Sequence, residues 1–595
     1  MAHIGFGFLF LFLLLRGTAH GLFVDEAETL RFNGRVYNRN TFTLQDAGQS
    51  TKLQIPFRDG QMMQSRTFIQ TELRHDLVDL VEGRYEGFLS FLQYPLRPLQ
   101  FLGPDDLSYF ITYRGEYDGV WDYGPDVFSE KFPLLSDCAP ITKSKQEHPR
   151  SFPGCTRLET RSRLRHRHRL FEVYLDFTKG PLFLRIGRQN LSWGETDAFR
   201  LLDNINPLDS SFGGFLVSLD ERRVPLDMAR VVYGLGSRGP FSELNLEAYG
   251  ALDDAIAEPV PTGSPWGVGN PPGIKGFVKK PARNFTDARG GVRVTATLGE
   301  FTLSAAHYYT FLDGPLVRIM TPEVRHPISK VRPPINLAEF AAEVAAGRTS
   351  RFLGDHFAAN LFFPKIPISG ASASFSVPRF DAVVRSEVAI FWREYFFKNS
   401  GPRNLLGPVL TGGQITPGYK QVGVDPETGS PLLTYKNDID RSRVVRWALG
   451  IDINRYIRFL NPQQSFIISG QMFSTHIVDF DDTPLASVLP YGFGHFAVPA
   501  RDPNRFKDTN SLVNIDQHQF VNTLLVTTSF RSGLVVPRLV FFYDWQGSWL
   551  VQPEITFIRD PFRLLFQYNY LDGQYNGIGF LRDRDNFIVQ LEVVL

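Results

Sequence analysis

The sequence predicts an all-β fold, a transmembrane antiparallel β-barrel of about 18 strands with long extracellular loops. Two features of the chain predict it. Apolar and polar residues alternate with a period of two over segments of eight to twelve residues, which is longer than the strands of a typical soluble protein. Tight turns and long polar connections also alternate along the chain, as they do in outer-membrane barrels with short periplasmic turns and long extracellular loops.

The composition of the chain excludes two broad classes of protein. Its 595 residues are 43% hydrophobic and 14% aromatic, and 63 basic side chains face 62 acidic ones. Disordered chains have few aromatic residues, and nucleic-acid-binding proteins carry a basic surplus. We therefore expect a folded protein that does not bind nucleic acid.

The N-terminus has the features of a secretory signal peptide. An apolar run from Ile4 to Leu15 ends at Arg16, and small residues suited to cleavage follow up to Gly21. The run is too short to span a bilayer. We interpret residues 1–21 as a signal peptide and residues 22–595 as one barrel domain, with a buried N-terminal strand as the alternative for the apolar run.

The strands can be counted backwards from the C-terminus. Sixteen alternating segments begin near residues 587, 563, 549, 534, 519, 465, 443, 382, 368, 301, 290, 241, 229, 182, 169 and 107. Two further candidates near residues 30 and 69 bring the total to 18. The alternative is a barrel of 16 strands with residues 22–106 as a plug. Either number leaves an aqueous channel, which smaller barrels lack.

Individual strands have one apolar and one polar face. In one segment the predicted lipid-facing residues are Phe171, Val173, Leu175 and Phe177. The last strand carries its apolar residues on one face, and these are Phe587, Val589, Leu591, Val593 and Leu595. It resembles the terminal strand that the barrel assembly machinery reads, although Leu595 replaces the usual Phe or Trp.

Two long polar connections carry further predictions. Cys138 and Cys155 are the only cysteines, and in a secreted chain a disulfide is favoured over metal ligation. A capping box at Asn336 predicts a loop helix up to Gly347. That helix would either restrict the mouth of the barrel or lie across the loops.

Three motif blocks stand in order along the chain. They are Arg114-Gly115-Glu116-Tyr117-Asp118-Gly119-Val120, then Gly187-Arg188-Gln189 with Trp193-Gly194-Glu195, then Asn204-Ile205-Asn206-Pro207-Leu208-Asp209. Together they resemble a family of uncharacterised Gram-negative outer-membrane proteins known by a domain of unknown function. The resemblance implies an outer-membrane barrel, in a family linked to hydrophobic-compound or lipid handling beside inner-membrane exporters. It does not settle the substrate.

The second block lies where a strand leaves the membrane and a long loop begins. We hypothesise that this loop folds inward and pairs its acidic residues with lumen arginines to form a constriction. The alternative is that the block only braces the loop against the wall. The candidate lumen or constriction residues are Arg114, Glu116, Asp118, Arg185, Arg188, Gln189, Trp193, Glu195, Asp203, Asn206, Asp209 and Arg223.

A second charged cluster contains Arg161, Arg163, Arg165, His166, Arg167, His168 and Arg169. If these side chains face outward at the cell surface, their guanidinium groups suit the phosphates of lipopolysaccharide. A solvated loop edge is the alternative. The cationic surroundings disfavour a metal site at the two histidines.

Sequence motifs of hydrolases, P-loop proteins and zinc enzymes are absent from the chain. We therefore expect no enzyme activity, no cofactor and no metal. The expected function is a channel or transport component in the outer membrane of a Gram-negative bacterium that passes small organic compounds, hydrophobic or lipid-like ones among them. The alternatives are a structural or adhesion barrel closed by its loops and, less favoured, a barrel hydrolase. The expected partners are outer-membrane lipid and lipopolysaccharide, the barrel assembly machinery and an inner-membrane exporter.

Overall fold

The computed structural model describes most of the barrel and part of its loops. The described residues are 22–25, 27–46, 57–128, 150–151, 161–162, 164–196, 199–258, 260, 265–266, 275–314, 316–320, 335–336, 338, 342, 345–346, 358–398, 419–424, 426, 429, 431–435, 439–480, 485–486, 516–573 and 577–594. The predicted signal peptide, Cys138 and Cys155, and most of the predicted helix after Asn336 lie outside them.

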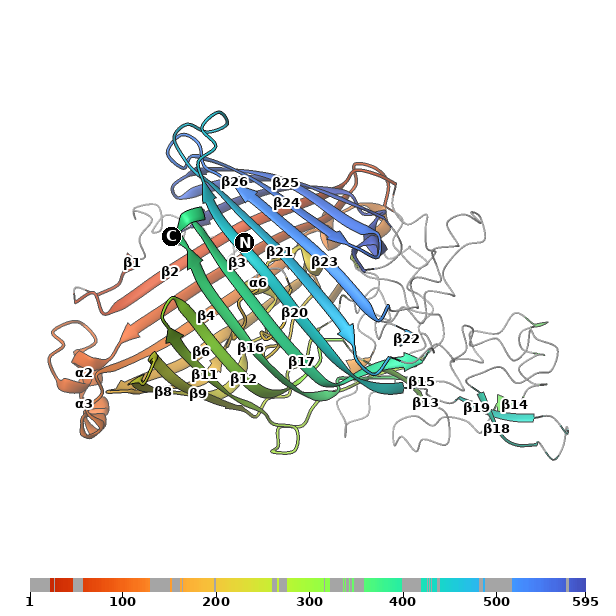
Figure 1. The fold of residues 1–595 in the computed structure, drawn as a ribbon, viewed down its shortest axis with the longest axis horizontal. Coiled ribbons are helices and arrows are strands. Elements are labelled where there is room, and N and C mark those ends of the chain that lie inside the picture. The colour runs from red at the N-terminus through yellow and green to blue at the C-terminus, as the bar shows by residue number, and fades with distance from the viewer. Residues whose placement is uncertain are drawn as a thin grey trace.

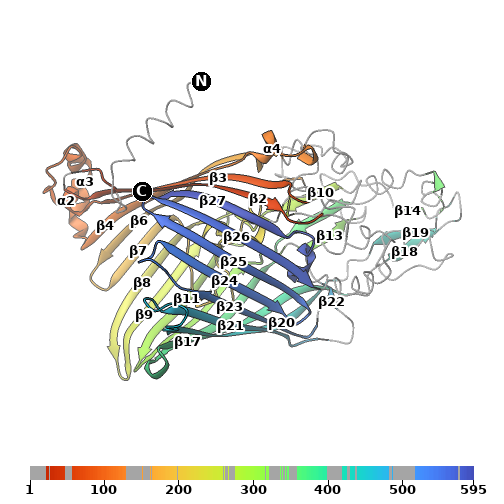
Figure 2. The ribbon, with the colours of Figure 1, turned by 90° about the horizontal axis from the view of Figure 1, so that it is seen from above.

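Eighteen strands form one closed barrel (Figures 1 and 2). Neighbouring strands are antiparallel, and β2 closes the barrel against β27. The barrel strands are β2 (Leu30–Thr43), β3 (Met62–Asp76), β4 (Asp106–Asp118), β6 (His166–Lys179), β7 (Leu182–Gln189), β8 (Leu226–Arg238), β9 (Phe241–Ala251), β11 (Arg289–Leu298), β12 (Phe301–Phe311), β16 (Lys365–Val377), β17 (Ala382–Lys398), β20 (Ile439–Arg455), β21 (Phe466–Ile477), β23 (His518–Thr527), β24 (Val535–Asp544), β25 (Ser548–Arg559), β26 (Phe562–Gly573) and β27 (Asn586–Val594).

The predicted fold class and the preferred count of 18 strands are confirmed. The alternative of 16 strands and a plug is wrong, because β2 and β3 pair along their lengths within the wall. One end of the barrel, here called the short-turn end, joins strands by tight turns such as residues 180–181, 239–240 and 299–300. The other end carries the long connections.

Short strands lie outside the barrel wall or extend its edges. Strand β1 (Leu22–Phe23) pairs with β2, and β22 (Leu485–Ala486) pairs with β17. Two small sheets belong to the long connections and were not predicted. They are formed by β5 (Arg150–Ser151), β10 (Lys275–Lys279), β13 (Leu316–Met320) and β15 (Ala358–Phe362), and by β14 (Ile335–Asn336), β18 (Tyr419–Val424) and β19 (Pro431–Tyr435).

The described helices are short. Those between β3 and β4 are α2 (Val78–Glu82), η1 (Ser90–Leu92), α3 (Gln93–Leu96) and η2 (Arg97–Leu102). The others are α4 (Val120–Tyr123), η3 (Asp126–Phe128), η5 (Gly214–Leu216), α6 (Leu219–Arg222), η6 (Pro378–Phe380) and η9 (Gly577–Leu581). Among the described residues, no helix is both long enough and apolar enough to cross a membrane.

Strand register shows which side chains face the lumen. Asp176 lies opposite Arg185 and pairs with it, whereas Leu175 lies opposite Ile186 on the outward face. Between β4 and β6 the register shifts at a bulge, and Phe171 is the extra residue. A bulge re-aims side chains. Phe171 is buried with the Arg114 guanidinium 3.4 Å from its ring centroid, so its predicted place on the lipid face is wrong.

Candidate functional site

The connection between β7 and β8 is called the inward loop here, and its described residues, 190–196 and 199–225, lie inside the barrel. Its side chains pack against residues on the inner wall. Leu202 of the loop is fully buried beside Gly370 of β16. A Cβ atom at Gly370 would lie 2.2 Å from the Val388 carbonyl oxygen of the next strand and 2.4 Å from the Leu202 Cδ2 atom, so a side chain here would clash with both the wall and the loop.

One side of the inward loop packs on an apolar, aromatic part of the wall. Trp193 is 1% exposed and meets the rings of Tyr249 and Tyr308 edge-on at centroid distances of 5.2 and 5.7 Å. The loop residues in this cluster also include Leu191, Leu201, Leu202 and Ile205, and the wall residues include Ile368, Ala389, Phe391, Ala448 and Phe473. We call this part of the wall the apolar half.

A buried carboxylate of β17 holds the loop backbone. Glu387 accepts hydrogen bonds from the backbone N–H groups of Glu195 at 2.7 Å and Leu202 at 2.5 Å. Arg385 of the same strand donates to the backbone carbonyl of Glu195 at 2.6 Å. The loop residue that the sequence singled out, Glu195, therefore contacts the wall through its backbone, not through its predicted carboxylate contact with an arginine.

Two hydroxyl groups of β12 bind the next stretch of the loop. The Tyr308 hydroxyl donates to the Leu202 carbonyl at 2.7 Å, and the Thr310 hydroxyl donates to the Asn204 carbonyl at 2.9 Å. Both wall residues are buried. These bonds satisfy backbone carbonyls that would otherwise be costly to bury.

Two buried side-chain amides form hydrogen bonds with backbone groups at the base of the loop. Asn206 is fully buried, accepts the Leu191 N–H at 2.8 Å and donates to the Val224 carbonyl at 2.9 Å. It thus ties the beginning of the loop to its end. Gln189, also fully buried, donates to the Met228 carbonyl of β8 at 3.1 Å. Of these two predicted site residues, Asn206 therefore acts on the loop conformation, and Gln189 links the two strands that flank the loop.

The opposite side of the loop meets a wall rich in arginine, formed by β2, β3, β4 and β6 and called the arginine half. Glu221 of α6 accepts from Arg66 at 2.9 Å, Arg35 at 3.1 Å and the Tyr37 hydroxyl at 2.8 Å. Burial alone would raise the pKa of the Glu221 carboxyl, but the nearby guanidinium groups, above all that of Arg66, lower it to about 2.

The arginine half also contains ion pairs between its own residues. Arg66 donates to Glu116 at 2.5 Å, and Arg167 pairs with the same carboxylate. Arg114 donates to Gln70 at 2.8 Å and to the Glu221 carbonyl at 3.2 Å. Arg66 and Glu116 are each almost completely buried. Such charges are costly to bury unless they are paired, which explains why each has several partners.

The loop carboxylate Asp209 is bound by two arginines of β6. Arg167 lies 2.7 Å and Arg169 3.4 Å from its Oδ2 atom. Burial alone would raise the pKa of Asp209, but these guanidinium groups hold it well below its usual range. Arg167 and Arg169 were expected to face outward toward lipopolysaccharide. That expectation is wrong, because the bulge at Phe171 places both on the inner face of the wall.

The remaining predicted residues are distributed over several contacts. Arg223 pairs with Asp203, another residue of the loop, so this pair does not join the loop to the wall. Arg185 instead pairs with Asp176 of the neighbouring strand at 2.6 Å. Arg188, on the other face of β7, donates to the Phe171 carbonyl at 3.2 Å. These three arginines thus do not form one ring.

Asp118 lies at the long-loop end of β4. It accepts hydrogen bonds from the Ser65 backbone N–H at 3.0 Å, the Gln64 side chain at 3.2 Å and the Val120 backbone N–H at 3.2 Å. These partners are neutral, so Asp118 braces the rim through hydrogen bonds with uncharged groups.

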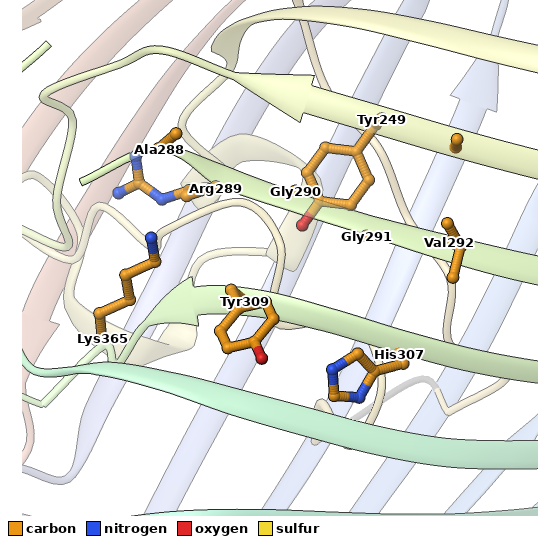
Figure 3. Close-up of a pocket in the computed structure, with 10 residues that line it drawn as sticks. Tyr249, Ala288, Arg289, Gly290, Gly291, Val292, His307, Tyr309 and Lys365 are labelled. Atoms are coloured by element: carbon orange, nitrogen blue, oxygen red, sulfur yellow. The ribbon is translucent and has the colours of Figure 1, made fainter. Parts of the chain in front are cut away.

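A separate hollow of about 510 Å³ lies on strands β9, β11, β12 and β16 (Figure 3). Lys365 and Tyr309 stand at one end and Val292 and His307 at the other. By strand register, Val292, His307 and Tyr309 lie on the outward face, and Gly290 lies between them without a side chain. Its lining also includes Tyr249 and Arg289, which are buried and have the inward register, so residues of both faces of the wall line the hollow.

Comparison with known families matches residues 105–593 to DUF1302, described as a protein of unknown function. The chain belongs to the DUF1302 family. The match covers most of the chain and includes all three motif blocks. No curated protein matches it.

Solved structures similar to this DUF1302 protein include two proteins with very different sequences. OccAB1 of Acinetobacter baumannii is 9% identical with a TM-score of 0.41, over 97% of this chain and 98% of that chain. OpdK of Pseudomonas aeruginosa, solved with vanillate, is 8% identical with a TM-score of 0.37, over 95% of this chain and 98% of that chain.

Several residues that hold the inward loop of this DUF1302 protein were missed in the sequence. They are Arg35, Tyr37, Arg66, Glu221, Tyr308 and Glu387. Each polar wall residue stands on the polar face of an alternating strand, like many others that have no contact with the loop. No local signal separated them, because β17, for example, carries Arg385, Arg393, Glu394 and Lys398 besides Glu387.

Proposed function

We propose that this protein is an outer-membrane channel that passes small organic compounds, including hydrophobic or lipid-like ones. The observation that carries the proposal is the inward loop, which is held across the lumen between the apolar half and the arginine half. A loop in this place narrows the conduit. The two unlike walls suit compounds with both an apolar body and an anionic group.

The proposed location follows from the wall itself. Outward-facing residues include exposed apolar side chains such as Leu175, Ile186 and Leu449, which are 42%, 52% and 49% exposed. The inner face carries ion pairs such as that of Arg230 and Glu247 at 2.7 Å. Apolar residues outside and charges inside are typical of outer-membrane barrels.

The preference for apolar compounds is supported by aromatic contacts of the loop. Phe199 of the loop is 39% exposed and contacts Phe473 of β21 and Phe542 of β24 at ring centroid distances of 5.2 and 5.5 Å. Its exposed edge gives a passing compound an apolar surface beside the ion pairs.

A second candidate function is a structural barrel whose lumen is closed by the loop. It is favoured by the complete burial of Trp193 and Leu202, which shows how tightly the loop is packed on one side. In that case the loop would be a permanent plug and the protein a surface scaffold.

Planar-bilayer recording on the purified protein separates the two functions. A channel gives stable single-channel conductance that a hydrophobic carboxylate reduces and a neutral sugar of similar size does not. A wild-type protein without conductance, together with a conducting variant in which residues 191–205 are replaced by a short Gly-Ser linker, would instead identify a closed scaffold.

A further inference from the structure

We propose that the connection between β3 and β4, residues 77–105, is a membrane anchor that inserts aromatic side chains into the phospholipid leaflet on the short-turn side. We call it the helical connection. The inference rests on the proposed location of the barrel in the outer membrane. It assigns a ligand class, phospholipid, to a surface that does not take part in the conduit. The helical connection also begins before the residues matched to the family.

The helical connection lies at the short-turn end, where other strands are joined by tight turns. In Figures 1 and 2, α2 and α3 project beyond the barrel at the end where the C-terminus lies. Its return to the barrel is fixed by hydrogen bonds to the next turn. Lys179 donates to the Leu102 carbonyl at 2.5 Å, and the Gly180 N–H donates to Asp105 at 2.6 Å.

The helical connection covers the outer face of the wall, not the lumen. Leu107 and Tyr109 of β4 and Phe177 of β6 have the outward register that Leu175 shares. Leu107 is nonetheless only 4% exposed. It is covered by apolar residues of the connection, which with their partly buried neighbours are Leu77, Val78, Leu80, Val81, Tyr85, Leu89, Leu92, Leu96 and Leu99. The connection therefore occupies space that lipid fills elsewhere around the barrel.

The face turned away from the wall is aromatic. The exposed fractions of Phe88, Phe91, Tyr94 and Phe101 are 61%, 67%, 86% and 81%. Between Gly87 and Gly103 the only charged residue is Arg97. A segment with leucines toward the barrel and large rings away from it has no face suited to bulk water.

The level of this aromatic face favours lipid as its occupant. Tyr109, under the connection, pairs with Leu175, and Leu175 is 42% exposed on the apolar outer wall. The connection thus adjoins the edge of the lipid-facing band. Aromatic side chains concentrate at this level in membrane barrels because their rings suit the boundary between acyl chains and headgroups. A soluble protein partner would need polar groups for specificity, and this face offers only Arg97 and a few amides.

The test is photo-crosslinking of the full-length protein in the outer membrane. The photoreactive residue p-benzoylphenylalanine replaces Tyr94 in one variant and Phe101 in another. Two control variants carry it at Leu175, on the lipid-facing wall, and at exposed Arg379 in another tight turn of the short-turn end. After irradiation, mass spectrometry of the purified barrel measures phospholipid adducts, and gels show protein adducts. Heat-modifiable migration confirms that each variant is folded.

We expect phospholipid adducts at positions 94 and 101 comparable to those at 175 and at least about fivefold above those at 379. Phospholipid adducts at position 175 alone would overturn the proposed anchor and would still support a barrel that lies in the membrane. A protein adduct at 94 and 101 would overturn it in favour of a partner interface. Absence of lipid adducts at 175 as well would show that the barrel itself is not in a bilayer, which is a failure of the proposed function.

Discussion

The two halves of the lumen wall hold the same loop by different physical means. In the apolar half, Trp193 is enclosed by rings, and its contribution is burial of apolar surface. In the arginine half, Glu221 is bound by guanidinium and hydroxyl groups that must each give up water. The stabilisation from apolar packing depends weakly on pH and salt, whereas the stabilisation from an ion pair depends on the protonation of its carboxylate. One attachment of the loop is thus insensitive to pH, and the other is sensitive to it.

The largest expected effect comes from removing a charge in the arginine half. Arg66→Met leaves Glu116 and Glu221 without their shared, nearly fully buried partner. We expect the free energy of unfolding to fall by about 3–5 kcal/mol, the usual cost of breaking a buried ion pair. Urea unfolding in detergent micelles, followed by gel mobility, measures it.

The matched control for this change is Arg443→Met. Arg443 pairs with Asp479 at 2.8 Å on an exposed surface, where such pairs contribute little. We expect no measurable loss in the free energy of unfolding. Equal losses in both variants would show that burial does not distinguish the arginine half from an ordinary surface.

The next effect concerns the apolar half. Trp193→Ala removes a buried ring and leaves a cavity, at a cost of about 3–4 kcal/mol. Because the ring belongs to the loop, we expect the loop to detach here first and the single-channel conductance to rise. Trp193→Phe, which keeps an aromatic ring, should retain most of the wild-type conductance. Unchanged conductance in Trp193→Ala would mean that this packing does not set the width of the conduit.

A smaller effect distinguishes the two halves by how their contributions to the free energy of unfolding depend on pH. The folded-state pKa of Glu221 is lowered to about 2 from an ordinary value of 4.5, so its stabilisation is complete above pH 4.5 and is lost as the pH falls toward 2. We expect Glu221→Gln to cost roughly 2–3 kcal/mol at pH 7 and progressively less below pH 4.5. Unfolding of both proteins across this range provides the measurement, with Trp193→Ala as the pH-independent reference. If the difference in the free energy of unfolding between wild type and Glu221→Gln did not change with pH, the charge of Glu221 would not be what holds the loop.

The smallest effect concerns one neutral hydroxyl group. Tyr308→Phe keeps the ring beside Trp193 and removes the hydrogen bond to the Leu202 carbonyl, together with the longer one accepted from the Asn204 N–H at 3.4 Å. We expect a loss of about 1 kcal/mol and little change in conductance. Tyr309→Phe, the next residue and 45% exposed on the outward face, serves as control. A loss as large as that of Trp193→Ala would show that the hydroxyl, and not the packing, holds the apolar half.

Much of the barrel could be predicted because the information is local. The period of two marks each strand within its own ten or so residues, and the tight turns mark where strands reverse. The 18 strands follow from these two signals. Asn206 and Gln189 could be singled out, but their bonds across the base of the loop could not, since Asn206 contacts residues 15 and 18 positions away.

The errors arose where one residue changes the register. The bulge at Phe171 shifts the pairing of β6 by one residue, and a shift of one residue exchanges the two faces. Phe171, Arg167 and Arg169 were therefore assigned to the wrong side. The bulge coincides with two adjacent apolar residues, Leu170 and Phe171, and the alternation is regular on either side of this pair.

The sequence by itself determined the fold class, the long loop after β7 and the amphipathic character of the wall, because each of these depends on neighbours along the chain, and it favoured 18 strands over 16. Only the tertiary structure decided which wall residues hold the inward loop. Glu387 meets Glu195 across 192 residues and Glu221 meets Arg66 across 155. Closure of the barrel brings these residues together, and no local pattern selects Glu387 or Arg66 from the other charges on the inner face.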